Sequence, residues 1–336
     1  MTYQLPIPVK TPLATREARL HHYLWHGIRN GWAFFTEAQK AALRAIAPGW
    51  VPNHARFNAD ESLNYGGGES FLYMHRRMIQ SVNAQLTALG EPVLVPWADI
   101  PEADDTGYPV PGGNNSANTR DPKSVAGLAR IKTLAQNILR PERLRTLSLS
   151  EFGTLIESYV HDPLHMRWAG DEGVMADFPN PDPLVLNPTL DAKYDALDSD
   201  YLGHPYSSHV NSTFWMLHGW VDRCIDQWQT ANGLSQIPWT DTWEGSPHSP
   251  PVPDVTPVLA GLFSASVLAP HSSAASVASA IPPPPPGDHH DHGHSHGNLE
   301  SLTKTFKLVN TFKECRIGFD YASRQPLPDR FKTLAE

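Results

Sequence analysis

The residues of this chain that are best suited to chemistry are histidines between Val160 and Trp228. His161 and His165 are four residues apart, and His218 follows after a long gap. Side chains at positions i and i+4 share one face of a helix, so the first two imidazoles could bind one metal ion together. These histidines therefore predict a metal site that suits copper. Imidazole also binds zinc, iron and nickel, so the ligands alone do not identify the metal.

Two segments around these histidines share further residues with a known family. The matching residues are Phe214, Trp215, His218, Asp222, Arg223 and Trp228 in the later segment and Leu155, Glu157, His161, His165 and Gly170 in the earlier one. Together they resemble copper-binding segments of the tyrosinase family of type 3 copper proteins. In that family, each of two copper ions is held by three histidines of a four-helix bundle, and the pair binds dioxygen.

The resemblance implies roles for individual residues. His161, His165 and His218 match the ligands of the second copper ion, copper B. Asp162 matches the Asn or Asp that helps to take the proton of a phenol, and Phe214 matches the aromatic residue that packs near the copper B imidazoles. The alternatives are a helix-end or turn residue for Asp162 and an ordinary core residue for Phe214.

A partial match lies upstream, where copper A is expected. Phe71-Leu-Tyr-Met-His75-Arg76 is similar to the family pattern Phe-Leu-x-Trp-His-Arg, which implies that His75 is the last ligand of copper A. His54 is the expected first ligand, with an exposed loop histidine as the alternative. The family has its middle ligand shortly before the His-Arg pair, where this sequence has Gly66.

The sequence therefore does not identify the middle ligand of copper A. The site could recruit Glu69 or a distant histidine, or it could remain empty. The candidate histidines are His22, His26, His204 and His209. Within the first predicted helix, His21, His22 and His26 are interpreted as exposed or helix-end residues rather than as a second metal patch.

Composition limits the partners and the compartment. The chain has 336 residues, of which 40% are hydrophobic and 18% charged, which is typical of a globular protein. The net charge of -9 argues against a nucleic-acid partner. The longest uncharged run is interrupted by prolines and serines, so no membrane span is expected. With only Cys224 and Cys315 and no secretory signal, the sequence favours a reduced, cytoplasmic location.

Hydrophobic periodicity and capping signals predict a mainly α fold, which the resemblance extends to a four-helix bundle with long loops. Thr36 with Gln39 and Ser148 with Glu151 are predicted capping boxes. The expected helices are 15–30, 36–47, 69–90, 124–139, 148–161 and 212–231. The expected irregular segments are an extended arm at 1–14, a surface loop at 91–122 and an insertion at 170–210.

The chain is expected to divide into three parts. These are a tyrosinase-like copper-binding domain at 1–244, a Pro/Ser/Ala-rich linker with a His-rich tract at 245–297, and a C-terminal extension at 298–336. The tract from His289 to His296 is either an unstructured surface segment or a low-specificity site for copper, nickel or zinc.

The C-terminal extension carries its own pattern. Phe306, Leu308 and Phe312 are spaced two and four residues apart, which favours a hairpin or a segment that covers another surface. Whether this segment shields the metal site is not decided by the pattern, because the partner of an apolar face depends on the fold.

The function expected from the resemblance is oxidation of a small phenol or o-diphenol by dioxygen at copper. Two copper ions are expected if copper A is completed, and one otherwise. The alternatives are a mononuclear copper oxygenase of a biosynthetic pathway and a non-catalytic copper-binding or copper-delivery protein. The number of copper ions bound per chain distinguishes these hypotheses.

Overall fold

A computed structural model describes residues 3–185, 188–245, 293–319 and 325–334. Within these ranges the chain forms helices joined by long loops, with two isolated bridges and no strand. The mainly α fold predicted from the sequence is therefore confirmed. No helix in the described part of the chain is long and apolar enough to cross a bilayer.

The helices begin and end close to the predicted boundaries because local capping signals fix them. The side chain of Thr15 accepts a hydrogen bond from Ala18 N at the start of α2, and both predicted capping boxes are formed. The main helices are α2 (Arg16–Gly31), α3 (Glu37–Ile46), α4 (Gly68–Ala88), α5 (Val125–Ile138), α6 (Pro141–Leu144), α7 (Leu149–Ile156), α8 (Asp162–Trp168) and α9 (Ser212–Ala231).

Short helical turns connect these helices. They are η1 (Pro48–Trp50), the π-helical turn η2 (Glu157–His161), η3 (Gly173–Asp177), η4 (Ala192–Asp195) and η5 (Ser208–Val210). The predicted loop at 91–122 contains no helix, and the described residues of the insertion at 170–210 form only such short turns. The arm at 1–14 was predicted to be extended, and this is wrong for α1 (Ile7–Leu13), where Pro6 precedes the helix and Val9 is buried.

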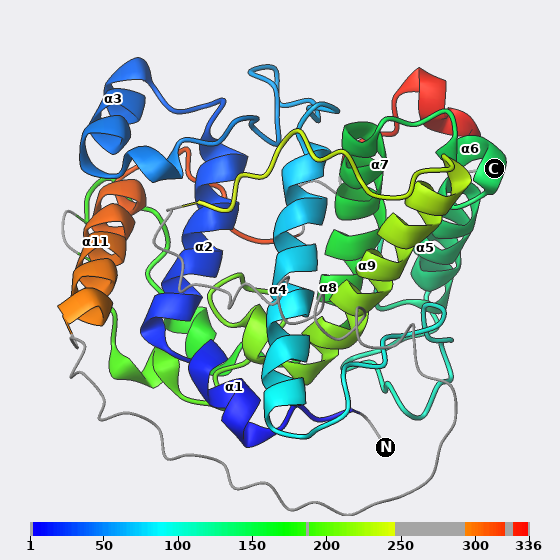
Figure 1. Ribbon diagram of the computed structural model, residues 1–336, viewed down its shortest axis with the longest axis horizontal. Coiled ribbons are helices and arrows are strands. Elements are labelled where there is room, and N and C mark those ends of the chain that lie inside the picture. Colours follow the sequence, from blue (N-terminus) through cyan, green and yellow to red (C-terminus); the bar gives the residue numbers. More distant parts are fainter. Residues whose placement is uncertain (1–2, 186–187, 246–292, 320–324, 335–336) are drawn as a thin grey trace, which may run out of the picture.

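Helix α4 is central to the fold. It packs against α7 and α9, and rings on α2 contact the ring of His75, so α4 lies between α2 and α9 (Figure 1). Gly68 and Gly153 make the close crossing of α4 and α7 possible, because a Cβ atom added at Gly153 would lie 2.2 Å from the carbonyl oxygen of Gly68. This crossing places His75 beside the segment that follows α7.

The segment after residue 292 is helical, so of the two predicted alternatives the hairpin is wrong, and the segment covers another surface, α2. Helix α11 (Gly293–Asn310) packs on α2, as the orange and blue ribbons in Figure 1 show. Leu302, Phe306 and Val309 are buried, and their i, i+4, i+7 spacing gives one apolar helix face. Most of the predicted linker, 246–292, lies outside the described residues, as do the side chains of the His-rich tract.

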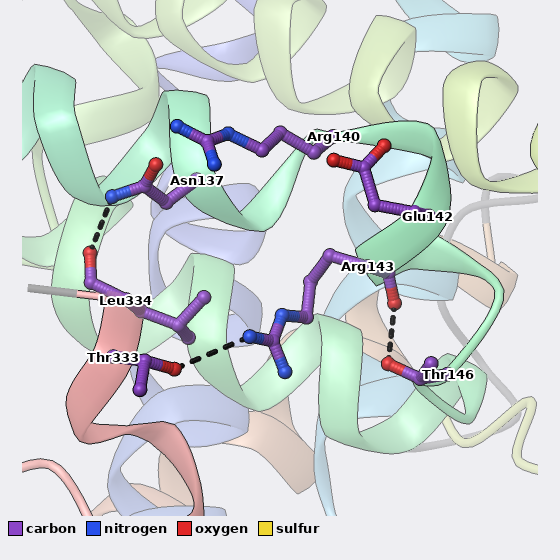
Figure 2. Close-up of a pocket in the computed structure, with 7 residues that line it drawn as sticks. All are labelled: Asn137, Arg140, Glu142, Arg143, Thr146, Thr333 and Leu334. Carbon is purple, nitrogen blue, oxygen red and sulfur yellow. Dashed lines mark hydrogen bonds between the residues drawn. The ribbon is translucent and has the colours of Figure 1, made fainter. Parts of the chain in front are cut away.

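Residues near the C-terminus pack against α5 and α6, which come much earlier in the sequence. Asn137 Nδ2 donates to the carbonyl oxygen of Leu334 at 2.9 Å, and Arg143 donates to Thr333 at 3.3 Å (Figure 2). These residues of α5, α6 and η6 (Asp329–Leu334) line a surface cavity of about 230 Å³. No histidine that the structure describes lines this cavity, so it is separate from the candidate site described next.

Candidate metal centre

Six buried histidines from four parts of the fold gather in the core. Each has at most 2% of its surface exposed. They are His22 and His26 from α2, His75 from α4, His161 and His165 from η2 and α8, and His218 from α9. Within the described residues, ligand atoms lie within 4.8 Å of one another in two groups: His22, His26 and His75, and His75, His161 and His218.

The three histidines expected to share one metal ion converge. Their ring centroids are 4.4 Å apart for His161 and His165, 4.7 Å for His161 and His218, and 5.2 Å for His165 and His218. His75 is also close, since its ring stacks on His218 at 4.5 Å. His75, His161 and His218 therefore have the closest ligand atoms, and the ring of His165 contacts those of His161 and His218.

On the other side of His75 lie the two histidines of α2. The ring centroids of His22 and His26 are 4.8 Å apart, and those of His26 and His75 are 5.8 Å apart. His22 and His26 are four residues apart on a helix, so their side chains lie one turn apart on the same face. The ring of His75 thus contacts both histidines of α2 as well as His161 and His218.

The Nδ1 atoms of five of these rings are held by oxygen atoms. His75 and His218 each bond the carbonyl oxygen four residues earlier, both at 2.8 Å. The remaining partners are Pro205 O for His22 at 2.6 Å, Asp162 Oδ1 for His161 at 2.9 Å and Leu202 O for His165 at 2.9 Å. An oxygen acceptor requires Nδ1 to carry the proton, so Nε2 of these neutral rings has a free lone pair.

The Nε2 atoms have the surroundings expected of metal ligands. Those of His22, His26, His75 and His165 are buried and have no hydrogen-bond partner among the described residues. Those of His161 and His218 lie 2.8 Å apart, although both carry lone pairs when Nδ1 is protonated. Buried polar atoms without partners call for an explanation such as an ion. A cation among these nitrogens satisfies the orphaned atoms and removes the lone-pair repulsion.

Burial also keeps the imidazoles in the form that binds metal. Desolvation lowers the pKa of His75 to about 4 and the pKa of His165 to about 3. Desolvation, together with neighbouring imidazoles, lowers the pKa of His22, His26, His161 and His218 well below 6.5. Neutral imidazole is the ligand form, so at neutral pH no proton competes strongly with a metal ion for these nitrogens.

A local irregularity places His161 and His165. The π-helical turn at Glu157–His161 connects α7 to α8, and Pro163 follows in the first turn of α8, where a missing N–H is tolerated. Insertions of π-helix inside longer helices are frequent at functional sites. The irregular turn ends before Pro163, because residues 162–168 form the regular helix α8, and the ring centroids of His161 and His165 lie 4.4 Å apart.

Aromatic rings surround the cluster and exclude water from it. Phe214 stacks on His218 with centroids 3.6 Å apart, as expected for a residue that packs near these imidazoles. Phe319, from the segment after α11, stacks on His165 at 3.9 Å and contacts His26 at 5.4 Å. Phe319 also contacts His161 at 5.8 Å, so it touches histidines of both groups, and the C-terminal segment covers part of the cluster.

Asp162 lies behind His161 rather than in front of it. Its carboxylate is fully buried, and it is bound to His161 Nδ1 and, at 2.5 Å, to Arg56 Nη2. Burial raises the pKa of Asp162 to about 7, against the opposite effect of Arg56. Because Nδ1 and Nε2 lie on different sides of the imidazole ring, this placement does not support contact between Asp162 and a substrate at the Nε2 side.

The structure does not bring His54 to the cluster, because its side chain is exposed in the loop before α4. His22 and His26 are the buried imidazoles beside His75, and their interpretation as exposed or helix-end residues is corrected. The signal that could have found them is the i, i+4 spacing, which is the same as that of His161 and His165.

The other candidates for the middle ligand have different partners. Glu69 binds the backbone and hydroxyl of Thr240 and the backbone N–H of Asp241. His209 contacts His22 through their Nδ1 atoms at 3.2 Å, so it lies behind a member of the cluster. His204 lies in an aromatic cluster with Tyr23 and Phe178.

Neither a known family model nor any curated protein sequence matches this chain. The fold and the site by themselves define a mainly helical protein with a buried histidine centre that could hold metal.

Proposed function

We propose that this protein is a copper-dependent oxidase with a tyrosinase-like helical bundle. One copper ion is bound by His22, His26 and His75, and a second by His161, His165 and His218. The observation that carries the proposal is the set of six buried imidazoles whose Nε2 atoms are orphaned or opposed to one another. The substrate class, a phenol or o-diphenol, comes from the resemblance of the segments around His75 and His218 to the tyrosinase family.

Bound copper would supply the redox chemistry that passes electrons from the phenol to dioxygen. The residues of the chain do the rest. The Nδ1 hydrogen bonds fix the ring orientation and the tautomer of the ligands, and the aromatic shell keeps bulk water away. Phe319 lies against His165, so a substrate that approaches His165 from that side has to displace this ring.

A mononuclear copper oxygenase is the second candidate. It is favoured by one observation, which is that His75 belongs to both groups of close ligand atoms. A single ion held by His75, His161 and His218 would leave His22 and His26 as neighbours. A copper-delivery role depends on the His-rich tract, which lies outside the described residues.

The test is to count metal and to follow oxygen consumption in the full chain. The metal-free protein is titrated with copper, and copper per chain is measured after removal of the excess. We expect two tightly bound ions and dioxygen-dependent oxidation of a simple catechol. One tight ion with turnover supports the mononuclear alternative. Absence of tight copper, or copper binding without oxidation of any phenol tested, contradicts the proposal.

A further inference from the structure

A ladder of four buried charges ends on one of the six histidines. Arg29 donates to both carboxylate oxygens of Glu157, at 2.6 and 2.9 Å. Arg56 lies 3.5 Å from Glu157 and binds Asp162 at 2.5 Å. Asp162 in turn accepts from His161 Nδ1 at 2.9 Å. The side chains of all four charged residues are at most 2% exposed.

The ladder connects separate parts of the fold. Arg29 is near the end of α2, Glu157 begins the π-helical turn, and Asp162 begins α8. Arg56 belongs to the loop before α4, and its backbone N–H donates to the carbonyl oxygen of Arg29 at 3.1 Å. The position of His161 is thus tied to α2 through charged groups as well as through apolar packing.

Stability alone is a weak reason for such a ladder. Two guanidinium groups face two carboxyl groups, but well-packed apolar residues in place of buried ion pairs are often as stable or more so. Removing one member would leave an uncompensated buried charge, which is strongly destabilising. The ladder therefore needs a second explanation, and its contact with His161 offers one.

His161 differs from its neighbours in the charge of its Nδ1 partner. The corresponding partners of His22, His75, His165 and His218 are neutral backbone carbonyls. A carboxylate is a stronger acceptor for the Nδ1 proton than a carbonyl, and it raises the basicity of the other ring nitrogen toward a metal. Because Arg56 holds Asp162 in place, the carboxylate keeps its orientation toward His161.

We infer that Arg56 and Asp162 are positioning residues that fix the Nδ1–H tautomer of His161 and make it a stronger donor to a metal than the four histidines whose Nδ1 bonds a backbone carbonyl. The two metal ions are then unequal, with tighter binding on the His161 side than the other ligands alone would give. This inference rests on the proposed metal centre, but its structural part is measurable without metal.

The first measurement uses the metal-free full chain. Two-bond ¹H–¹⁵N spectra of the imidazole rings identify which nitrogen of His161 carries the proton. We expect the Nδ1–H tautomer in the wild-type protein and a mixture of tautomers in the double variant Asp162→Asn with Arg56→Gln. The double variant leaves Arg29 and Glu157 as a balanced pair. A wild-type His161 protonated at Nε2 overturns the inference even if copper binds.

The second measurement is copper affinity by competition with a chelator. We expect the double variant to bind one of its two copper ions about 10- to 100-fold more weakly, in the range typical for loss of a ligand's outer partner. The matched control, Lys10→Gln with Asp200→Asn, removes an ion pair of 3.0 Å elsewhere and is expected to bind both ions as the wild type does.

The outcomes separate the two hypotheses. Wild-type affinity for both ions, with an unchanged copper EPR spectrum in the double variant, overturns the inference while leaving the metal centre intact. No copper binding by the wild-type chain contradicts the proposed function, and the tautomer of His161 is still read from the metal-free protein. If the double variant fails to fold, the wild-type tautomer remains the deciding result.

Discussion

His26 and His54 both precede His75 in the sequence, and they differ in burial. His26 lies in the core with 1% of its surface exposed, and its Nε2 has no partner among the described residues, whereas His54 is exposed in a loop. A metal ion gains most from nitrogens that are already desolvated and held in place. Burial and ring orientation therefore favour His26 over His54 as a ligand in the proposed centre.

The replacement His26→Ala is expected to reduce bound copper from two ions per chain to one, because the group on α2 would keep only His22 and His75. His54→Ala is the matched control and is expected to retain both ions. Elemental analysis of the copper-loaded proteins gives the count. A loss of copper in the His54 variant, or full copper in the His26 variant, would contradict this ligand assignment.

At the scale of elements, the site depends on the crossing of α4 and α7. Gly68 and Gly153 allow the backbones to touch, and His75 on α4 is thereby brought near His161 and His165, which follow α7. Interaxial distances between packed helices depend on the side chains at the contact. A larger residue at this crossing would move α4 away from the two histidines.

Gly153→Ala is expected to destabilise the protein by about 1–3 kcal/mol, the usual range for overpacking a core. The added methyl group has no room, because a Cβ at this position would lie 2.2 Å from Gly68 O. Gly170→Ala is the control, since its Cβ would lie 3.9 Å from Pro111 Cγ, at ordinary contact distance. Urea unfolding of the metal-free proteins measures both changes, and equal stability of the two variants would show that the crossing tolerates a side chain.

At the scale of the whole molecule, the buried histidines couple stability to pH. Burial lowers the pKa of His75 to about 4 and those of His165 and His209 to about 3, compared with 6.5 in the unfolded chain. Below 6.5 the unfolded chain therefore binds protons that the native chain does not. Their contribution to stability is complete above 6.5 and is lost as the pH falls toward 3–4. The raised pKa of Asp162 has the opposite effect on the pH dependence of stability, but several histidines contribute and only one carboxyl group opposes them.

The metal-free protein is accordingly expected to lose stability between pH 7 and pH 5. Each histidine that remains neutral contributes a slope that rises from well below about 1 kcal/mol per pH unit near pH 7 to about 1.4 kcal/mol per pH unit near pH 5, as the unfolded chain becomes fully protonated. Urea unfolding at several pH values, with chelator present, measures the total slope. A free energy of unfolding that stays constant over this interval would mean that the histidines are protonated in the native state.

Much of the fold could be predicted because its signals are local. Two capping boxes, Thr36 with Gln39 and Ser148 with Glu151, each use residues three positions apart to fix the start of a helix. The spacing of apolar residues then marks the helix faces that are buried. The segment at Phe306 was predicted less well, because a short alternation of apolar residues fits a strand, while the longer spacing from Leu302 to Val309 fits a helix. The sequence also singled out His75, His161, His165 and His218 as ligands, whereas His22 and His26 were only two of several candidates for the middle ligand.

The sequence by itself determined which residues can bind metal and which of them share a helix face, since both depend on side-chain chemistry and on the period of the helix. Only the tertiary structure decided that His22 and His26 join His75, that His54 does not, and that Asp162 lies behind His161. These facts depend on which helix faces meet across the core. Burial, the Nδ1 hydrogen bonds and the distances between Nε2 atoms exist only after α2, α4, α8 and α9 have packed together.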